Sequence, residues 1–450
     1  MGRALRRLGQ AEPKVSQGLL DAVRTHSLPL RAPIDLGPLL EHIGRARYVL
    51  LGEASHGTHE YYSWRAEISQ RLIERYGFQF IAVEGDWPDC YRINRYVKAL
   101  PESGESAREV LHHFDRWPTW MWANEEVESL VKWLRAYNDR QSSDDKVGFY
   151  GLDVYSLWDS LYQVMGYLTK HDPGALPAAR RAFRCFEPYG EDVQEYARAT
   201  RWVDASCEDD VVKLLADVQR FAAPPPHDGA ESLFNAKQNA LVVKNAERYY
   251  RMMVQGGPES WNVRDRHMVE TLERLMRQHA PDAKGIIWEH NTHVGDARYT
   301  DMVDDGMVNV GQLVRERHGD NGVAIVGFGS FRGKVIAGRE WEAPMDRMTL
   351  IPARTDSWEE LFHRVGPENR MILFESGPRM HAEFLEPRGH RAVGVVYRPE
   401  HEQFGNYVPS VLPLRYDAFL YFDETQALRP LHQVKARDAG EVPETYPSGV

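Results

Sequence analysis

The chain has 450 residues, of which 42% are hydrophobic and 11% aromatic, and its formal net charge is -11. This length exceeds that of a usual single core, so we expect a large α/β core with a second subdomain. No stretch approaches the ~18 consecutive apolar residues of a membrane span, and the acidic balance without a dense basic run excludes nucleic acid as a favoured partner. The arginines at positions 3, 6 and 7 are not followed by the apolar run of a signal peptide, which predicts a cytoplasmic protein.

Short apolar runs rich in β-branched residues recur along the chain, each followed by polar residues or glycine. They are 48–51, 80–83, 147–150, 285–288, 323–326, 371–374, 393–397 and 419–422. Continuous apolar runs without alternation predict strands that are buried on both faces, as in a parallel sheet covered by helices. Between the first two runs, Ile68, Leu72, Ile73 and Tyr76 keep helical spacing and Gly77 supplies a stop. The sequence therefore predicts an α/β fold with a helix-covered, mostly parallel mixed sheet.

Helical periodicity replaces the strand signal from about Val154 to Ala280. We expect an α/β core at 1–153 and 281–432, an inserted helical subdomain at 154–280 that forms a cleft with the core, and a loosely ordered tail at 433–450. The Pro-rich segment 224–229 predicts a break between helices of the insertion. Because the insertion follows a strand that ends in Asp153, we expect it to cover the carboxyl edge of the sheet.

The chain has three cysteines, Cys90, Cys185 and Cys207, an odd number without CxxC spacing. This pattern argues against a disulfide framework and against a thiolate zinc site. We expect these cysteines to be packed or inert.

Three predicted strand ends carry clusters of ionisable side chains. Glu53 and His56 follow the first strand, Glu84 ends the second, and His290 and His293 follow the fourth. Ligands of open α/β sheets collect at the carboxyl ends of the strands, and imidazole beside carboxylate supports general acid-base catalysis near neutral pH. We assign His56 as the general base, with Glu53 or Glu84 as its orienting carboxylate. The alternative is that these residues only cap helices and strand ends.

Further residues of this edge have two possible roles each. His290 and His293 would stabilise negative charge on an ester oxygen or bind a metal, in which case His56, Glu84 and His290 are the expected ligands. No HExxH signature is present, so we expect no cofactor, with a divalent metal as the alternative. Arg65 would clamp an oxyanion or pair with a carboxylate. We expect Asp86, Trp87, Trp122 and His293 to contact the substrate, although the cluster Trp117, Trp120 and Trp122 also fits plain core packing.

Several segments together resemble the erythromycin esterase family over about residues 30–432. They are LGEASHGTHE at 51–60, IAVEGDWPD at 81–89 with Arg92 and 94–96, NVRDRHM at 262–268, WEHNTH at 288–293, RGKVIA at 332–337 and YDAFLYFDE at 416–424. The EGDWP stretch is closer to the broad branch that includes proteins labelled succinoglycan biosynthesis proteins than to the dedicated antibiotic-resistance enzymes.

The resemblance implies a mixed α/β core, a helical lobe and a cleft between them. It also implies that Glu53, His56, Glu84 and His290 line the site, that His56 activates water for lactone opening, and that Arg65 takes part. The expected activity is hydrolysis of a small-molecule ester or macrolactone without a covalent intermediate.

Two alternatives remain. One is a metal-dependent hydrolase that uses the same residues, and the other is a non-catalytic protein that binds a polyketide or saccharide. A GxSxG elbow is absent, which disfavours a serine hydrolase.

Overall fold

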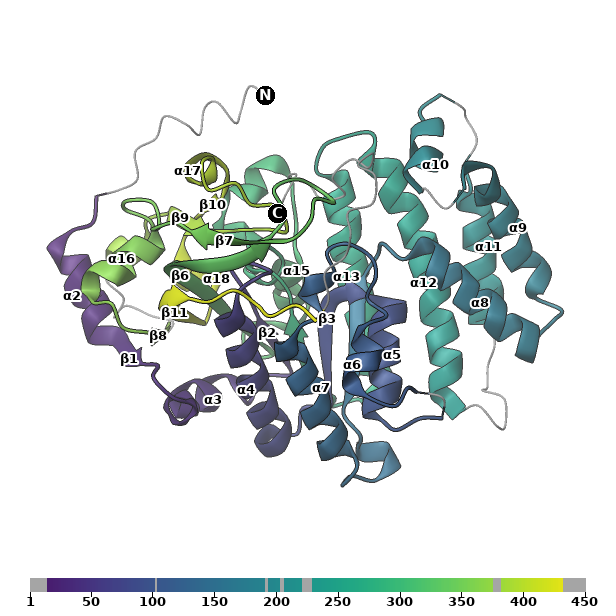
Figure 1. The fold of residues 1–450 in the computed structure, drawn as a ribbon, viewed down its shortest axis with the longest axis horizontal. Coiled ribbons are helices and arrows are strands. Elements are labelled where there is room, and N and C mark those ends of the chain that lie inside the picture. The colour runs from purple at the N-terminus through teal and green to yellow at the C-terminus, as the bar shows by residue number, and fades with distance from the viewer. Residues whose placement is uncertain are drawn as a thin grey trace.

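The computed structural model of the chain describes residues 14–101, 103–190, 193–202, 206–220, 229–374 and 382–431. Within these ranges the protein is built on a nine-stranded sheet with helices on both faces (Figure 1). The predicted Pro-rich break, apart from Gly229, and the predicted tail at 433–450 lie outside the described residues.

The middle of the sheet consists of neighbouring parallel strands, as predicted. Their order is β4 (Gly148–Asp153), β3 (Phe80–Asp86), β5 (Gly285–Trp288), β2 (Tyr48–Leu51), β6 (Val323–Ala337) and β11 (Ala418–Thr425). Antiparallel strands complete it: β8 (Arg370–Leu373) beside β11, β1 (Ser27–Pro29) beside β8, and β7 (Asp346–Leu350) beside β6. A separate ribbon pairs β9 (Arg388–Arg391) with β10 (Tyr407–Ser410). The prediction of a mostly parallel mixed sheet is confirmed.

Apolar side chains of the central strands alternate between two buried layers. One layer packs under α4 (His59–Tyr76) and α7 (Glu125–Asn138), and the other under α13 (Glu259–His279), α15 (Val310–His318) and α16 (Trp358–Val365). Helix α4 ends where Gly77 adopts a φ of +72°, a conformation that glycine reaches without steric cost. Both faces of the sheet are thus closed, and its strand ends remain the places where polar groups gather.

The remaining helices of the core are short. They are α2 (Gln17–His26), α3 (Gly37–Ile43), α5 (Trp87–Val97), α6 (Ala107–Leu111), α14 (Asn291–Val294), α17 (Glu402–Gly405) and α18 (Leu412–Arg415). A helical lobe contains α8 (Leu157–His171), α9 (Leu176–Phe186), α10 (Val193–Ala199), α11 (Glu208–Gln219) and α12 (Gly229–Met253), which share an apolar core of their own. Figure 1 shows this lobe on the right, beside the sheet.

Two cysteines of the lobe form a disulfide, contrary to the expectation from their spacing. Cys185, in α9, is bonded to Cys207, which precedes α11, across 22 residues of sequence. Packing of α9 against α11 brings the two together, with their Cα atoms 5.8 Å apart, and short-range spacing carries no information on such a pair. Cys90 is free and buried, as expected for a packed cysteine.

The predicted strand at 393–397 is wrong. This segment makes only isolated bridges, Ser55 to Val393 and Gly338 to Val396. The Val393 N–H donates to the Ala54 carbonyl at 2.8 Å, and Val395 accepts from the Gly338 N–H at 2.9 Å. The segment is apolar because it is buried against the loop that follows β2, and not because it lies within a sheet. In the described part of the chain, no helix has both the length and the hydropathy to cross a membrane.

Candidate active site

Four ionisable side chains meet at the carboxyl edge of the sheet. Strands β2, β5 and β3 are parallel neighbours, so Glu53, His290 and Glu84 emerge at one edge. The ring centroids of His56 and His290 are 5.0 Å apart, and the backbone N–H of His290 donates to Glu84 Oε2 at 2.8 Å. The structure therefore brings together the four residues that the strand-end argument selects.

His56 is held in one orientation by Glu53. Its Nδ1 lies 3.0 Å from Glu53 Oε1, and Glu53 Oε2 accepts from Arg65 Nη2 at 2.7 Å. Burial lowers the pKa of His56, but the charges of Glu84 and Glu53 and the hydrogen bond to Glu53 raise it above its ordinary value. Because Nδ1 is bonded to Glu53, Nε2 is the ring nitrogen left to accept a proton.

The turn that carries His56 is fixed by a close backbone approach. A Cβ on Gly57 would lie 1.9 Å from the Ile336 carbonyl oxygen, so only glycine fits here. The Gly57 carbonyl accepts from the N–H groups of Ile336 and Leu428, each at 3.0 Å. Gly57 thus allows β6 and the segment around Leu428 to hold the turn in place.

Glu84 belongs to a buried ionic network with Arg264 and Asp153. Arg264 donates through Nε and Nη2 to the two oxygens of Asp153, at 2.9 and 2.7 Å, and through Nη2 to Glu84 Oε1 at 2.7 Å. Burial alone would raise the pKa of Glu84, but His293, Arg264 and His56 hold it well below its usual range. Glu84 is therefore ionised, and its charge favours a protonated His56.

His290 is a buried imidazole next to His56 and is not among the residues that line the cleft. Its Nδ1 lies 3.3 Å from the backbone N–H of Thr292, which can only donate, so Nδ1 is an acceptor and Nε2 carries the proton. Burial and the charge of His56 hold the pKa of His290 well below its usual range. Nε2 is buried and makes no hydrogen bond of normal geometry among the described residues, although the backbone of Ala54 lies within reach of the ring. His290 is thus a neutral donor beside His56.

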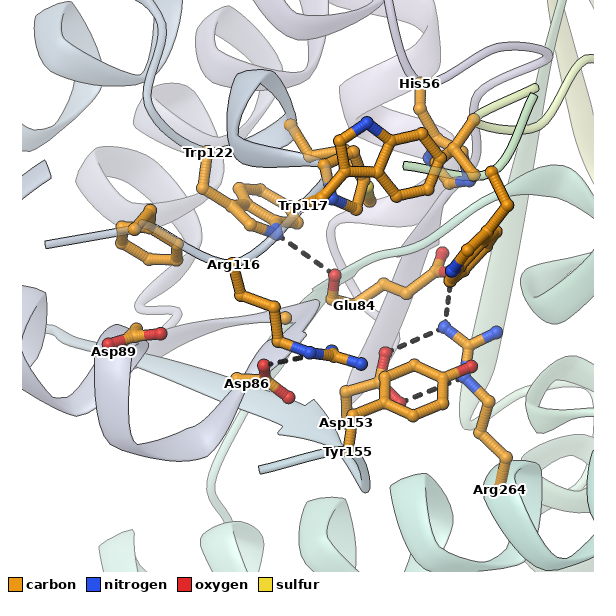
Figure 2. Close-up of a pocket in the computed structure, with 16 residues that line it drawn as sticks. His56, Glu84, Asp86, Asp89, Arg116, Trp117, Trp122, Asp153, Tyr155 and Arg264 are labelled. Carbon is orange, nitrogen blue, oxygen red and sulfur yellow. Dashed lines mark hydrogen bonds and ion pairs between the residues drawn. The ribbon is translucent and has the colours of Figure 1, made fainter. Parts of the chain in front are cut away.

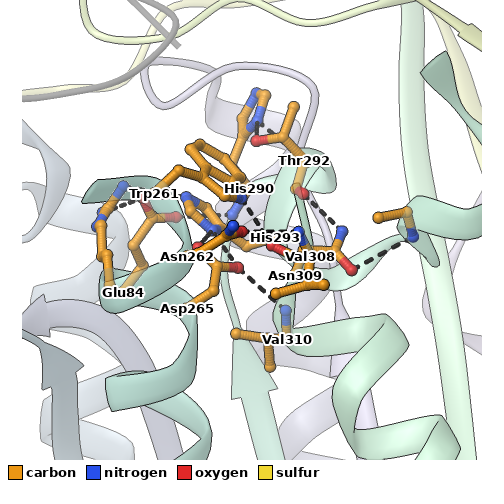
Figure 3. Close-up of polar contacts among 12 residues, drawn as sticks. Glu84, Trp261, Asn262, Asp265, His290, Thr292, His293, Val308, Asn309 and Val310 are labelled. Atoms are coloured by element: carbon orange, nitrogen blue, oxygen red, sulfur yellow. Dashed lines mark hydrogen bonds and ion pairs between the residues drawn. The ribbon is translucent and has the colours of Figure 1, made fainter. Parts of the chain in front are cut away.

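His293 lies behind this pair (Figure 3). Its Nδ1 is 3.0 Å from both Asp265 oxygens, and its Nε2 is 3.0 Å from Arg264 Nη1. The ring stacks on Trp261 with centroids 4.4 Å apart. His293 therefore joins α13 to the His290 turn and has no direct access to the cleft.

A cleft opens in front of His56 and Glu84 (Figure 2). It contains about 690 Å³ of space out to the open solvent. Besides the polar groups around Arg264, its walls carry aromatic residues from two other segments: Phe114, Trp117 and Trp122 from the 112–122 region, and Trp341 from the connection between β6 and β7. The rings of Trp117 and Trp341 meet edge to face at 4.7 Å. Of the predicted helical insertion, only Tyr155 and Arg264 appear among the lining residues of this cleft.

The other residues selected from the sequence fall into two groups. Asp86 and Trp122 line the cleft, and Trp122 Nε1 donates to the Glu84 carbonyl at 3.1 Å. Arg65 is fully buried behind Glu53, with Tyr62 and Trp288 rings 4.4 and 4.7 Å from its guanidinium carbon. Trp87 is also fully buried, and its Nε1 donates to Asn235 of α12 at 2.8 Å, away from the cleft lining.

Sequence reasoning overlooked Arg264, Asp265 and Glu289. The first two lie in the NVRDRHM segment, one of the segments that carry the family resemblance, and that was the signal that could have found them. Glu289 is fully buried, and neither carboxyl oxygen has a hydrogen-bond partner among the described residues. Burial, with the nearby charges of Glu84 and Asp265, raises the pKa of Glu289 well above its usual range. Burial therefore favours the protonated form of this carboxyl group.

Several donor atoms of the expected metal ligands are already engaged within the protein. Both oxygens of Glu84 are occupied, one by Arg264 and the other by the His290 N–H, and Nδ1 of each histidine is bonded within the protein. Across the described ranges no group of three or more His, Cys, Asp or Glu side chains is arranged to hold a metal. A guanidinium occupies the place where a cation would bind Glu84.

The chain is similar to known proteins in sequence and in structure. A family model described as erythromycin esterase matches residues 73–425, a range that includes Glu84, Arg264 and His290 and begins after Glu53 and His56. An erythromycin esterase type II from Escherichia coli is 22% identical over 369 residues, which is 76% of this chain and 84% of that protein.

Solved structures share the fold. A succinoglycan biosynthesis protein aligns with a TM-score of 0.73 at 20% identity, over 93% of this chain and 100% of that chain. A Bacillus cereus protein aligns with a TM-score of 0.73 at 19% identity, over 94% of this chain and 100% of its own. A histidine-to-asparagine mutant of the erythromycin esterase EreC, in its open conformation, aligns with a TM-score of 0.61 at 19% identity, over 92% and 97% of the two chains.

Proposed function

The chain belongs to the erythromycin esterase family, and on that premise we propose that it hydrolyses a small-molecule ester or lactone with a water molecule activated by His56. The observation that carries this proposal is the Glu53–His56 pair at the cleft wall. Glu53 holds Nδ1 of His56 at 3.0 Å, so Nε2 faces the reacting partner. A histidine oriented by a carboxylate is an effective general base near neutral pH.

The proposed reaction has two steps. Nε2 of His56 takes a proton from water while the water oxygen attacks the ester carbonyl, which gives a tetrahedral intermediate with a negatively charged oxygen. The imidazolium then returns its proton to the leaving alkoxide as the ester C–O bond breaks, which yields an acid and an alcohol, or a hydroxy acid from a lactone. Glu53 and Glu84 stabilise the imidazolium between the two steps. No covalent bond to the enzyme forms.

Negative charge on the intermediate needs a preorganised donor. The Nε2–H of His290 is such a group, because it is buried, makes no hydrogen bond of normal geometry among the described residues and lies on a ring whose centroid is 5.0 Å from that of His56. Removal of one donor of this kind costs roughly 10²- to 10³-fold in kcat. We assign His290 this role, with Arg264 as the fixed cation that keeps Glu84 ionised.

The aromatic walls of the cleft favour a substrate that carries an apolar ring next to the scissile bond. Trp117, Trp122 and Trp341 face the cleft from two segments and offer flat apolar surface. Asp86 and Arg116, paired at 3.4 Å, provide polar contacts at the same opening. We propose that Asp86 and Trp122 contact the substrate, and that Arg65 acts from behind by holding Glu53.

Neither alternative function is favoured by the site. A metal-dependent reaction would require Glu84 to leave Arg264, so we propose that the enzyme works without a metal. A protein that only binds its ligand has little need for a buried carboxylate–histidine pair next to a second histidine donor.

The test is a screen of aryl esters, simple lactones and macrolides with the wild-type protein and His56→Gln. We expect at least one of these classes to be hydrolysed by the wild type and not by the variant. Binding of the same compounds without turnover by either protein would support the binding function and reject the esterase proposal.

A further inference from the structure

The side-chain amide of Asn291 lies at the centre of a second network, whose residues do not line the cleft. Its Nδ2 donates to the Phe328 carbonyl at 2.7 Å, and its Oδ1 accepts from the Phe328 N–H at 3.3 Å. The amide thus makes two hydrogen bonds with the backbone of Phe328 in β6, one as donor and one as acceptor. A Cβ on Gly52 would lie 2.1 Å from Oδ1, so the glycine that ends β2 leaves room for this amide.

His390 and Glu359 hold the amide in this orientation. The Nε2 of His390 lies 3.2 Å from Asn291 Nδ2, and its Nδ1 lies 2.5 Å from Glu359 Oε1. The contacts with Phe328 require Asn291 to present its NH₂ group, so Nε2 must be an acceptor. His390 therefore carries its proton on Nδ1 and donates it to Glu359. All three side chains are at most 1% exposed.

The backbone of Asn291 connects this network to the catalytic groups. Its N–H donates to the Glu53 carbonyl at 2.8 Å, and its carbonyl accepts from Arg415 Nη2 at 2.8 Å. Asn291 also follows His290 directly and begins α14. One residue thus links the loops that follow β2 and β5 to the interior of β6, so a shift of Asn291 would move the loop of Glu53 relative to His290.

We propose that Asn291 is a positioning residue for the hydrolysis, held in register by His390 and Glu359, and we call these two residues the relay. This inference rests on the proposed function, because the relay acts through Glu53 and His290 and touches no substrate. Displacements of about 1 Å at reacting groups cost up to roughly 10²-fold in rate, so loss of the relay should lower kcat more than it changes KM.

Two substitutions of His390 form a matched pair. In His390→Gln the amide oxygen replaces Nε2 and still accepts from Asn291, whereas in His390→Asn the shorter amide keeps the contact with Glu359 and loses the one with Asn291. Both variants bury an amide in place of the ring, so their melting temperatures should fall by similar amounts. We expect kcat of the first to stay within about 3-fold of the wild type and kcat of the second to fall about 10- to 100-fold, with KM nearly unchanged.

Ring ¹⁵N NMR of histidine-labelled protein tests the relay without a substrate. The wild type should show His390 protonated on Nδ1 and His290 on Nε2, and the signals of His290 and His56 should move in His390→Asn and stay in place in His390→Gln. Equal kcat and equal spectra in the two variants would overturn the positioning role. If the wild type hydrolyses no compound of the screen, the esterase proposal fails while the spectra still decide whether the relay orients His290.

Discussion

Glu53 contacts the Nδ1 of His56 through one carboxylate oxygen, at 3.0 Å, and Arg65 through the other, at 2.7 Å. Glu84, the other carboxylate that the sequence offered as the orienting group, bonds Arg264 and the His290 backbone instead. The two carboxylates therefore differ in their action on His56: Glu53 fixes the tautomer and the ring, and Glu84 acts through its charge.

Replacement of Glu53 by Gln should shift the acid limb of the pH–rate profile to lower pH. Only neutral His56 accepts a proton from water, so kcat/KM rises with pH through the pKa of His56, which Glu84 and Glu53 raise above its ordinary value. Removing the Glu53 charge lowers that pKa, while the Gln oxygen can still accept from Nδ1. We expect a lower midpoint and a reduced plateau, measured as kcat/KM from pH 5 to 9. An unchanged midpoint would exclude Glu53 as the residue that sets the ionisation of His56.

His56→Gln should remove hydrolysis and leave the fold in place. General base catalysis contributes typically ~10²- to 10⁴-fold, and its loss appears in kcat rather than in KM. Circular dichroism and the melting temperature serve as controls for folding. Turnover by His56→Gln at the wild-type rate, on a substrate verified with the wild type, would refute the mechanism.

The convergence of Glu53, Glu84 and His290 at one edge of the sheet could be predicted from the sequence because it depends on few assumptions. Parallel neighbouring strands must deliver their following residues to one edge, and the runs at 48–51, 80–83 and 285–288 show that they are strands by composition alone. The same reasoning fails for residues whose partners come from distant segments. Arg264 of α13 contacts Asp153 and Glu84, which lie far away in the sequence. Trp341 contacts Trp117 across 224 positions. No local sequence pattern predicts either contact.

Trp87 shows the limit of the same reasoning. It follows Glu84 and Asp86 in the sequence, but its ring packs in a buried layer with Tyr91 and Tyr150 and does not line the cleft. There the ring stacks on Tyr150 at 5.6 Å and bonds Asn235. Position after a strand predicts the edge at which a residue lies, and the direction of its side chain depends on how the next helix begins.

Activity should survive exhaustive chelation. Arg264 takes the place of a cation at Glu84, with Nη2 2.7 Å from Oε1, so no step of the proposed reaction draws on a metal. The measurement is kcat/KM after dialysis against EDTA, with elemental analysis of the same sample. Loss of activity that a divalent ion restores, together with loss of bound metal in His290→Ala, would instead support the metal-dependent alternative.

The aromatic walls should determine which esters are preferred. Trp341→Ala removes one side of the Trp117–Trp341 contact and opens the cleft. We expect the ratio of kcat/KM for a cyclohexyl or benzoyl ester to that for an acetyl ester to fall about 10-fold. Trp133→Ala is the control, because Trp133 stacks on Tyr137 of α7 and does not line the cleft. An equal ratio in both variants would show that the walls do not select the substrate.

Histidines whose pKa is lowered by burial should make the fold sensitive to mild acid, and the partly buried His279 offers a way to measure this effect. Burial lowers the pKa of His279 to about 4, and the ring stacks on Phe80 with centroids 4.9 Å apart. An unfolded chain protonates this histidine below its ordinary pKa of about 6.5, whereas the folded protein does so only near pH 4. Between these values the unfolded state binds more protons, so the free energy of unfolding falls as the pH falls. Burial also lowers the pKa of His267 to about 4, which adds to the same trend.

His279→Phe should weaken this dependence, because phenylalanine keeps the stacking surface and has no proton to bind. We expect the variant to lose less stability than the wild type between pH 6.5 and pH 4.5, with a slope that corresponds to up to one proton fewer. Urea denaturation at several pH values in this range measures it, and His113→Gln, at an exposed histidine, is the control. If His279→Phe and the wild type lose stability in parallel, the acid sensitivity arises elsewhere, and His267 becomes the next residue to replace.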